Sequence, residues 1–90
     1  MLKELISNRK DRIFIHVPDP VESAEFLIQA EGEGFIFSDG ARPTEKHTSD
    51  FYAIHGDKTI NYIGTIGRIA YQAHGVKTME FSQLKQIHTN

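Results

Sequence analysis

Short apolar runs alternate with polar turns along most of the chain, and this pattern predicts strands connected by helices and loops. The first run, residues 12–17, is rich in β-branched and aromatic residues and predicts a strand. Directly after it, Asp19 is placed to cap a helix, with Pro20 at the first helical position and Glu22 where a capping box has its carboxylate. The pattern therefore predicts a strand followed by a helix from Pro20 to about Glu31.

The pattern continues with strands separated by turns. Gly32 and Gly34 end the predicted helix, and residues 38–40, Ser-Asp-Gly, form a turn sequence. Residues 56–58, Gly-Asp-Lys, separate two apolar runs, which is typical of a β-hairpin. Beyond the first strand, strands are expected at 35–37, 51–55, 59–63 and 76–81, with a loop at 41–50.

Helical segments are also expected near both ends and after the hairpin. Residues 1–10 contain a short N-terminal helical segment, and Thr65 caps a second helix that Gly75 closes. Residues 83–90 form a frayed tail or a short terminal helix. The sequence thus predicts one α+β domain over residues 1–90, with a mainly antiparallel sheet, element order near (α)βαβββαβ, and helices packed on the sheet.

Alternation along the strands predicts which residues form the core. The face expected to meet the helices carries Ile13, Ile15, Val17, Phe35, Phe37, Ile54, Ile60, Tyr62, Met79 and Phe81. The opposite face is less polar than an exposed face should be, because it carries Phe14, Ile36, Phe51 and Ile63, with His16 and His55 among them.

The first helix adds to this apolar surface. Val21, Ala24, Leu27 and Ile28 share one stripe of the helix, and Phe26 points nearly the other way. Phe14, Phe26 and Phe51 together therefore indicate a protein-binding surface or a homo-oligomer. The alternative is that the second helix covers the opposite sheet face and that Phe26 packs under the N-terminal segment.

Charge and composition narrow the classes of function. A formal net charge of −2 and a pI near 6.2 are not those of a nucleic-acid-binding domain. The absence of cysteine excludes disulfides and thiolate metal sites and suits a reducing compartment. The N-terminal residues mix charged and apolar side chains, unlike a signal peptide, and no apolar run is long enough to cross a membrane. We expect a cytoplasmic protein.

The best candidate ligand site is the segment Gly64-Thr65-Ile66-Gly67-Arg68. It joins a predicted strand to a predicted helix, where backbone N–H groups and the helix dipole favour an anion. Arg68 would add a charged contact to a phosphate or nucleotide, and Tyr62 or Tyr71 would stack on a base. The segment lacks the Lys-Ser/Thr of a P-loop, so the alternative is a tight connection capped by Thr65.

Catalytic and metal chemistry find little support. The five histidines show no spacing typical of a metal site, and no serine lies in a nucleophile motif. A pair formed by His55 and Asp57 near the hairpin turn is a third hypothesis, which requires a cleft that joins them to another polar group. We therefore expect no catalytic residues, no cofactor, no metal and no enzymatic activity.

The order of these signals resembles a group of small proteins of unknown function from phages and prophages of Gram-positive bacteria. The shared signals are the helix residues 22–27, Gly34-Phe35, Ser38-Asp39-Gly40, Pro43-Thr44 and Ile63-Gly64, and they continue to Tyr71, Gly75 and residues 80–82. An early tryptophan of that group is absent here, with Phe37 nearest to its place. The resemblance implies a non-enzymatic accessory protein that binds a host or phage protein, such as a defence factor, or a nucleotide signal.

Overall fold

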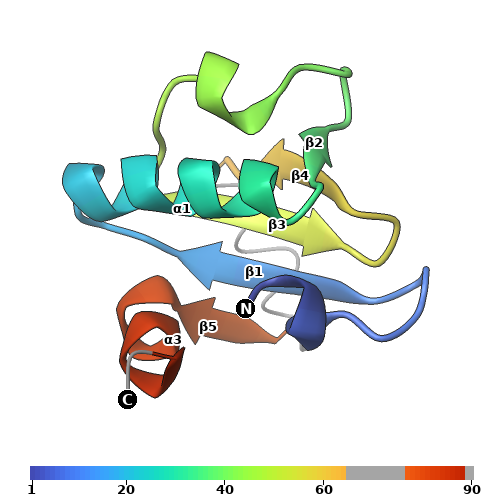
Figure 1. Cartoon of the computed structure of the whole chain (residues 1–90), viewed down its shortest axis with the longest axis horizontal. Coiled ribbons are helices and arrows are strands. Elements are labelled where there is room, and N and C mark those ends of the chain that lie inside the picture. The colour runs from blue at the N-terminus through green and yellow to red at the C-terminus, as the bar shows by residue number, and fades with distance from the viewer. Residues whose placement is uncertain (65–76, 89–90) are drawn as a thin grey trace.

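A computed structural model describes residues 1–64 and 77–88, which form a five-stranded sheet in the order β2-β4-β3-β1-β5 (Figure 1). Its strands are β1 (Arg12–His16), β2 (Ile36–Phe37), β3 (Phe51–His55), β4 (Thr59–Tyr62) and β5 (Thr78–Glu80). The predicted strands are confirmed, each within a few residues of its expected ends.

The sheet is mixed. β3 pairs antiparallel with both β1 and β4, so the predicted hairpin is confirmed and forms the centre of the sheet with β1. The two edge strands, β5 beside β1 and β2 beside β4, are parallel to their neighbours. The predicted α+β class, with helices packed on one sheet, is confirmed.

Helix α1 (Pro20–Gly32) begins as the sequence predicts. The Asp19 carboxylate accepts a hydrogen bond from the Val21 N–H at 2.8 Å, and Pro20 occupies the first helical position. Glu22, expected to complete a capping box, instead lies 3.4 Å from the Lys85 ammonium group of helix α3 (Phe81–His88). The chain after β5 is thus a helix that begins at Phe81 and is tied to α1, so the short terminal helix, and not the frayed tail, is the predicted alternative that the structure shows.

The orientation of α1 about its axis differs from the prediction. Ser23, Phe26, Leu27 and Ala30 are buried, whereas Val21 is 69% and Ile28 is 64% exposed. The Phe26 ring stacks on Tyr52 with centroids 4.4 Å apart and meets Phe81 edge-on at 5.7 Å. Phe26, together with Leu27 and Ala30, therefore faces the sheet and is not part of an exposed surface.

The helix-facing side of the sheet is the predicted core face. The helical turn η1 (Lys3–Leu5), α1 and α3 all cover this side, as Figure 1 shows for α1 in front of β3. Leu2, Tyr52 and Leu84 extend the predicted core, and Tyr62 and Met79 lie at its margin.

The opposite side of the sheet has a smaller buried cluster of Phe14, Phe51, Ala53 and Ile63. The Phe14 and Phe51 rings meet edge-on at 5.7 Å and are 0% and 5% exposed, so they are core residues and do not form a protein-binding surface. Ile36, on the edge strand, is 46% exposed. The predicted second helix, which one of the two alternatives places over this side, lies outside the described residues.

Candidate functional site

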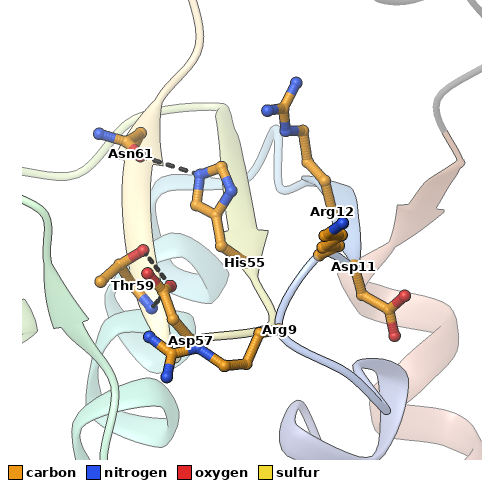
Figure 2. A pocket seen from close by; sticks show the side chains of 8 residues that line it. Arg9, Asp11, Arg12, His55, Asp57, Thr59 and Asn61 are labelled. Atoms are coloured by element: carbon orange, nitrogen blue, oxygen red, sulfur yellow. Dashed lines mark hydrogen bonds between the residues drawn. The ribbon is translucent and has the colours of Figure 1, made fainter.

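A pocket of about 420 Å³ lies at one end of the sheet, on the side opposite α1 (Figure 2). Two segments line it: the loop that leads into β1, and the β3–β4 hairpin. Its side chains are those of Arg9, Lys10, Asp11, Arg12, His55, Asp57, Thr59 and Asn61. Volumes of this order are typical of small-molecule sites.

A glycine allows these two segments to meet. The Gly56 N–H donates a hydrogen bond to the Asp11 carbonyl oxygen at 2.8 Å, which joins the hairpin turn to the loop. A Cβ atom at Gly56 would lie 1.7 Å from the Asn8 carbonyl oxygen, a distance that real Cβ atoms do not reach. The absence of a side chain at Gly56 therefore allows Arg9 and Lys10 to share a pocket with Asp57.

The loop itself is shaped by Asp11. Its carboxylate accepts hydrogen bonds from the Ser7 N–H at 2.6 Å and the Asn8 N–H at 3.1 Å, and these bonds hold the pKa of Asp11 below its usual value. Figure 2 shows this carboxylate directed away from His55. The turn presents Arg9 and Lys10, and within residues 1–64 and 77–88 neither of their side chains forms an ion pair.

The second carboxylate of the pocket is also engaged within its own turn. Asp57 accepts hydrogen bonds from the Thr59 hydroxyl at 2.6 Å and from the Thr59 N–H at 3.1 Å, and the hydroxyl bond is the main cause of its lowered pKa. Both carboxylates therefore stay ionised at neutral pH, and both have hydrogen-bond donors of their own. The side chains of Arg9, Lys10 and Arg12 line the same pocket.

His55, the last residue of β3, lines the pocket, and a hydrogen bond with Asn61 orients its ring. The Asn61 side-chain amide donates to the Ser38 hydroxyl, so its carbonyl oxygen is the acceptor for His55 Nε2 at 2.9 Å. The neutral imidazole therefore carries its proton on Nε2. Arg12 is the cross-strand neighbour of His55 in the β1–β3 pairing, and Figure 2 shows the two side chains on the same side of the sheet.

A second hollow of about 180 Å³ adjoins the pocket along the sheet. The two share Arg12, His55 and Asn61, and the remaining lining comes from Ala53, Tyr62, Ile63 and Gly64. We call the first the basic pocket and the second the side hollow. The two therefore adjoin, and the basic pocket is lined by charged residues whereas Ala53, Ile63 and Gly64 line the side hollow.

Of the predicted phosphate site, only Tyr62 and Gly64 lie within the described residues. Gly64 is exposed and lines the side hollow, and a Cβ there would meet nothing within 4 Å. Tyr62 presents its ring to the helix-covered side of the sheet, where it stacks on His47 at a centroid distance of 4.6 Å and its hydroxyl donates a hydrogen bond to the His47 carbonyl. It is therefore not the predicted stacking wall. Thr65, Gly67, Arg68 and Tyr71 lie outside the described residues.

The sequence reasoning missed Arg9, Lys10 and Arg12. The signal was present as a short run in which three of four successive residues are basic, Arg9-Lys10-Asp11-Arg12. The pair proposed for acid–base chemistry, His55 and Asp57, does line one pocket, but each hydrogen-bonds to a different partner. In the described part of the chain, no group of three or more His, Cys, Asp or Glu residues could hold a metal ion.

A separate apolar surface lies on α1. Val21, Ala24 and Ile28 share the solvent-facing stripe of this helix, and we call it the outer face of α1. Beside it is a hollow of about 340 Å³ lined by Ala24, Leu27, Ile28, Thr44, Lys46 and Thr48. Glu25, on the flank of the stripe, is paired with Lys85 at 2.9 Å.

Comparisons with protein-family models, curated proteins and solved structures give no match to this chain. Among the described helices, none has the length and apolar character needed to cross a membrane. The site is therefore interpreted from its own geometry.

Proposed function

We propose that this protein is a non-enzymatic binding domain that holds a phosphate-bearing ligand in the basic pocket. One observation carries the proposal: Arg9, Lys10 and Arg12 line a pocket in which both carboxylates are already hydrogen-bonded within their own turns. A phosphate there would gain guanidinium and ammonium donors without displacing an ion pair of Arg9 or Lys10. Charge-assisted hydrogen bonds of this type are short and strong.

The ligand class follows from the size and charge of the site. A guanidinium group binds phosphate oxygens in pairs, and an ammonium group adds a compact positive charge. The basic pocket is proposed in addition to the predicted segment 64–68, of which Gly64 alone lies within the described residues. The hypothesis of a small-ligand binder is kept, with Arg9, Lys10 and Arg12 as the binding residues.

The test is a titration with inorganic phosphate and pyrophosphate at low ionic strength, where exposed charges are least screened. Backbone amide NMR shifts would be followed in the wild type and in an Arg9→Gln/Lys10→Gln variant. Arg42→Gln is the control, because Arg42 is paired with Glu45 at 2.9 Å and does not line the pocket.

We expect saturable shifts at residues 8–12 and 55–61 in the wild type and the control. The double variant should bind at least about tenfold more weakly, since each lost charged hydrogen bond costs roughly 1.5–3 kcal/mol. Equal affinity in all three proteins would show that the basic pocket is not the binding site.

A second candidate function is protein binding through the outer face of α1. Val21 and Ile28 are the two most exposed large hydrophobic residues in the described part of the chain, and a hollow lies beside them. Contiguous exposed apolar surface with an adjoining hollow is typical of a protein contact. The partner would be a host or phage protein, as the resemblance implies, or a second copy of this chain.

This candidate is tested by light scattering and by capture from a host lysate. Ile28→Glu should abolish self-association or capture, whereas Ile36→Glu, on the distant edge strand, should leave both unchanged. A monomer whose captured proteins are the same for both variants would rule out this surface.

A further inference from the structure

Because the side hollow adjoins the basic pocket, the two together have room for a ligand larger than a phosphate. We infer that the ligand is a nucleoside monophosphate, with its phosphate at Arg9 and Lys10 and its planar base in the side hollow. The inference rests on the proposed function, because the phosphate contacts anchor the base. It goes beyond that function by assigning a role to the apolar end of the site.

The side hollow has the lining that a planar ring needs. Ala53 and Ile63 give it an aliphatic floor, and both belong to the buried cluster beneath it. Arg12 and His55 stand side by side at its junction with the basic pocket. A guanidinium plane and an imidazole ring both stack on heterocyclic bases, so these two side chains form the wall against which a base would lie.

The polar groups at this junction are fixed in direction. The Asn61 carbonyl oxygen accepts from His55 Nε2 and has a second lone pair, which suits an amino group on a base. Because the Asn61 amide is itself held by Ser38, the acceptor cannot rotate away without breaking that bond. The junction is thus organised before a ligand arrives, which lowers the entropic cost of binding.

The experiment compares three probes by calorimetry: inorganic phosphate, ribose 5-phosphate and a set of nucleoside 5′-monophosphates. At least one nucleotide should bind about tenfold or more tightly than ribose 5-phosphate, because a stacked base contributes roughly 1–3 kcal/mol. Gly64→Leu places a side chain at the rim of the hollow, where no atom lies within 4 Å of the added Cβ. It should remove this tenfold gain, whereas Gly32→Leu, at the end of α1, should retain it.

Gly32→Leu is the matched control, because Gly32 also has open space around it and lies at the end of α1. Nucleotides that bind no tighter than ribose 5-phosphate would overturn the inference and leave the phosphate site standing. A nucleotide preference that Gly64→Leu and Ala53→Val both fail to change would also overturn it. Absence of binding by every probe, phosphate included, would reject the proposed function together with the inference.

Discussion

The hydroxyl groups of Ser23 on α1 and Tyr52 on β3 lie 2.6 Å apart inside the core, and Ser49 closes a ring of hydrogen bonds with them. Ser23 donates to the Ser49 carbonyl at 2.6 Å, and the Ser49 N–H donates to the Tyr52 oxygen at 2.8 Å. Tyr52 therefore donates to Ser23, and each hydroxyl is both donor and acceptor. Burial raises the pKa of Tyr52, so its hydroxyl keeps its proton over the physiological range.

Breaking this ring should destabilise the fold. Ser23→Ala leaves the Ser49 carbonyl and the Tyr52 hydroxyl without their partner, and an unsatisfied buried polar group costs about 1–3 kcal/mol. Urea denaturation of Ser23→Ala, Tyr52→Phe and the double variant would measure this loss. Because the three residues form one network, the double variant should lose less than the sum of the single variants. Strict additivity would contradict the ring.

The acid stability of the protein should depend on Glu33. Its side chain is 8% exposed, and burial alone would raise the pKa of its carboxyl group. Hydrogen bonds from the Lys3 N–H at 2.7 Å, the Gln29 amide and the Leu2 N–H at 2.9 Å outweigh burial and lower the pKa. A lowered folded-state pKa stabilises the fold above the unfolded value, about 4.3, and this contribution is lost as the pH falls through the folded value.

Glu33→Gln should therefore lower the free energy of unfolding at pH 7. The variant should then lose less stability than the wild type as the pH falls below about 5. Thermal unfolding from about pH 7 to 3 in the two proteins measures the difference. Parallel curves for wild type and variant would show that Glu33 does not contribute to acid unfolding.

Gly56→Ala should distort the basic pocket, although Gly56 contributes no polar side chain to it. The added methyl would lie 1.7 Å from the Asn8 carbonyl oxygen, so the loop carrying Arg9 must move away from the hairpin. We expect a lower melting temperature and weaker phosphate binding. Gly32→Ala is the control, because its methyl meets no atom within 4 Å and Gly32 lines neither the basic pocket nor the side hollow. Unchanged phosphate binding in a folded Gly56→Ala protein would contradict this role of Gly56.

Removing one negative charge should strengthen anion binding. Asp57→Asn keeps an oxygen acceptor for Thr59 and eliminates the carboxylate charge that lines the pocket. We expect phosphate to bind several-fold more tightly, with the gain shrinking as salt rises because the effect is electrostatic. Asp39→Asn, whose carboxylate pairs with Lys46 away from the pocket, should give no gain.

The orientation of α1 can be tested by stability alone. Phe26 is fully buried, so Phe26→Ala should cost about 3–5 kcal/mol by opening a cavity in the core. Ile28 is 64% exposed, and Ile28→Ala should change stability by roughly 0.5 kcal/mol or less. Similar losses for the two variants would mean that the helix is rotated from the observed orientation.

The face of each strand that meets the helices was predictable because successive side chains point to opposite faces, which leaves two choices. In each strand the more strongly apolar set of alternate residues indicated the right one. Ile13, Ile15 and Ile54 all fall on the predicted side of the sheet. The face of α1 was not predictable in the same way, because both of its stripes contain apolar residues. The deciding interaction, Phe26 stacked on Tyr52, joins residues 26 positions apart and has no local sequence signal.

The basic pocket could not be predicted from the sequence, for a similar reason. Arg9 and Lys10 precede β1, whereas Asp57 follows β3, and only the β1–β3 pairing and the contact at Gly56 bring them together. The glycine of a hairpin turn is expected for its backbone freedom. Its role in a close backbone approach depends on a loop elsewhere in the chain.

The parallel pairing of β5 with β1 affects how the protein folds during synthesis. Phe14 is paired with Thr78, so a nascent chain that has exposed residues 1–64 still has an open hydrogen-bonding edge on β1. Phe81 and Leu84, which complete the core, emerge later still. If translation pauses before β5 is made, the ribosome-bound chain should therefore need a chaperone to prevent aggregation through this open edge.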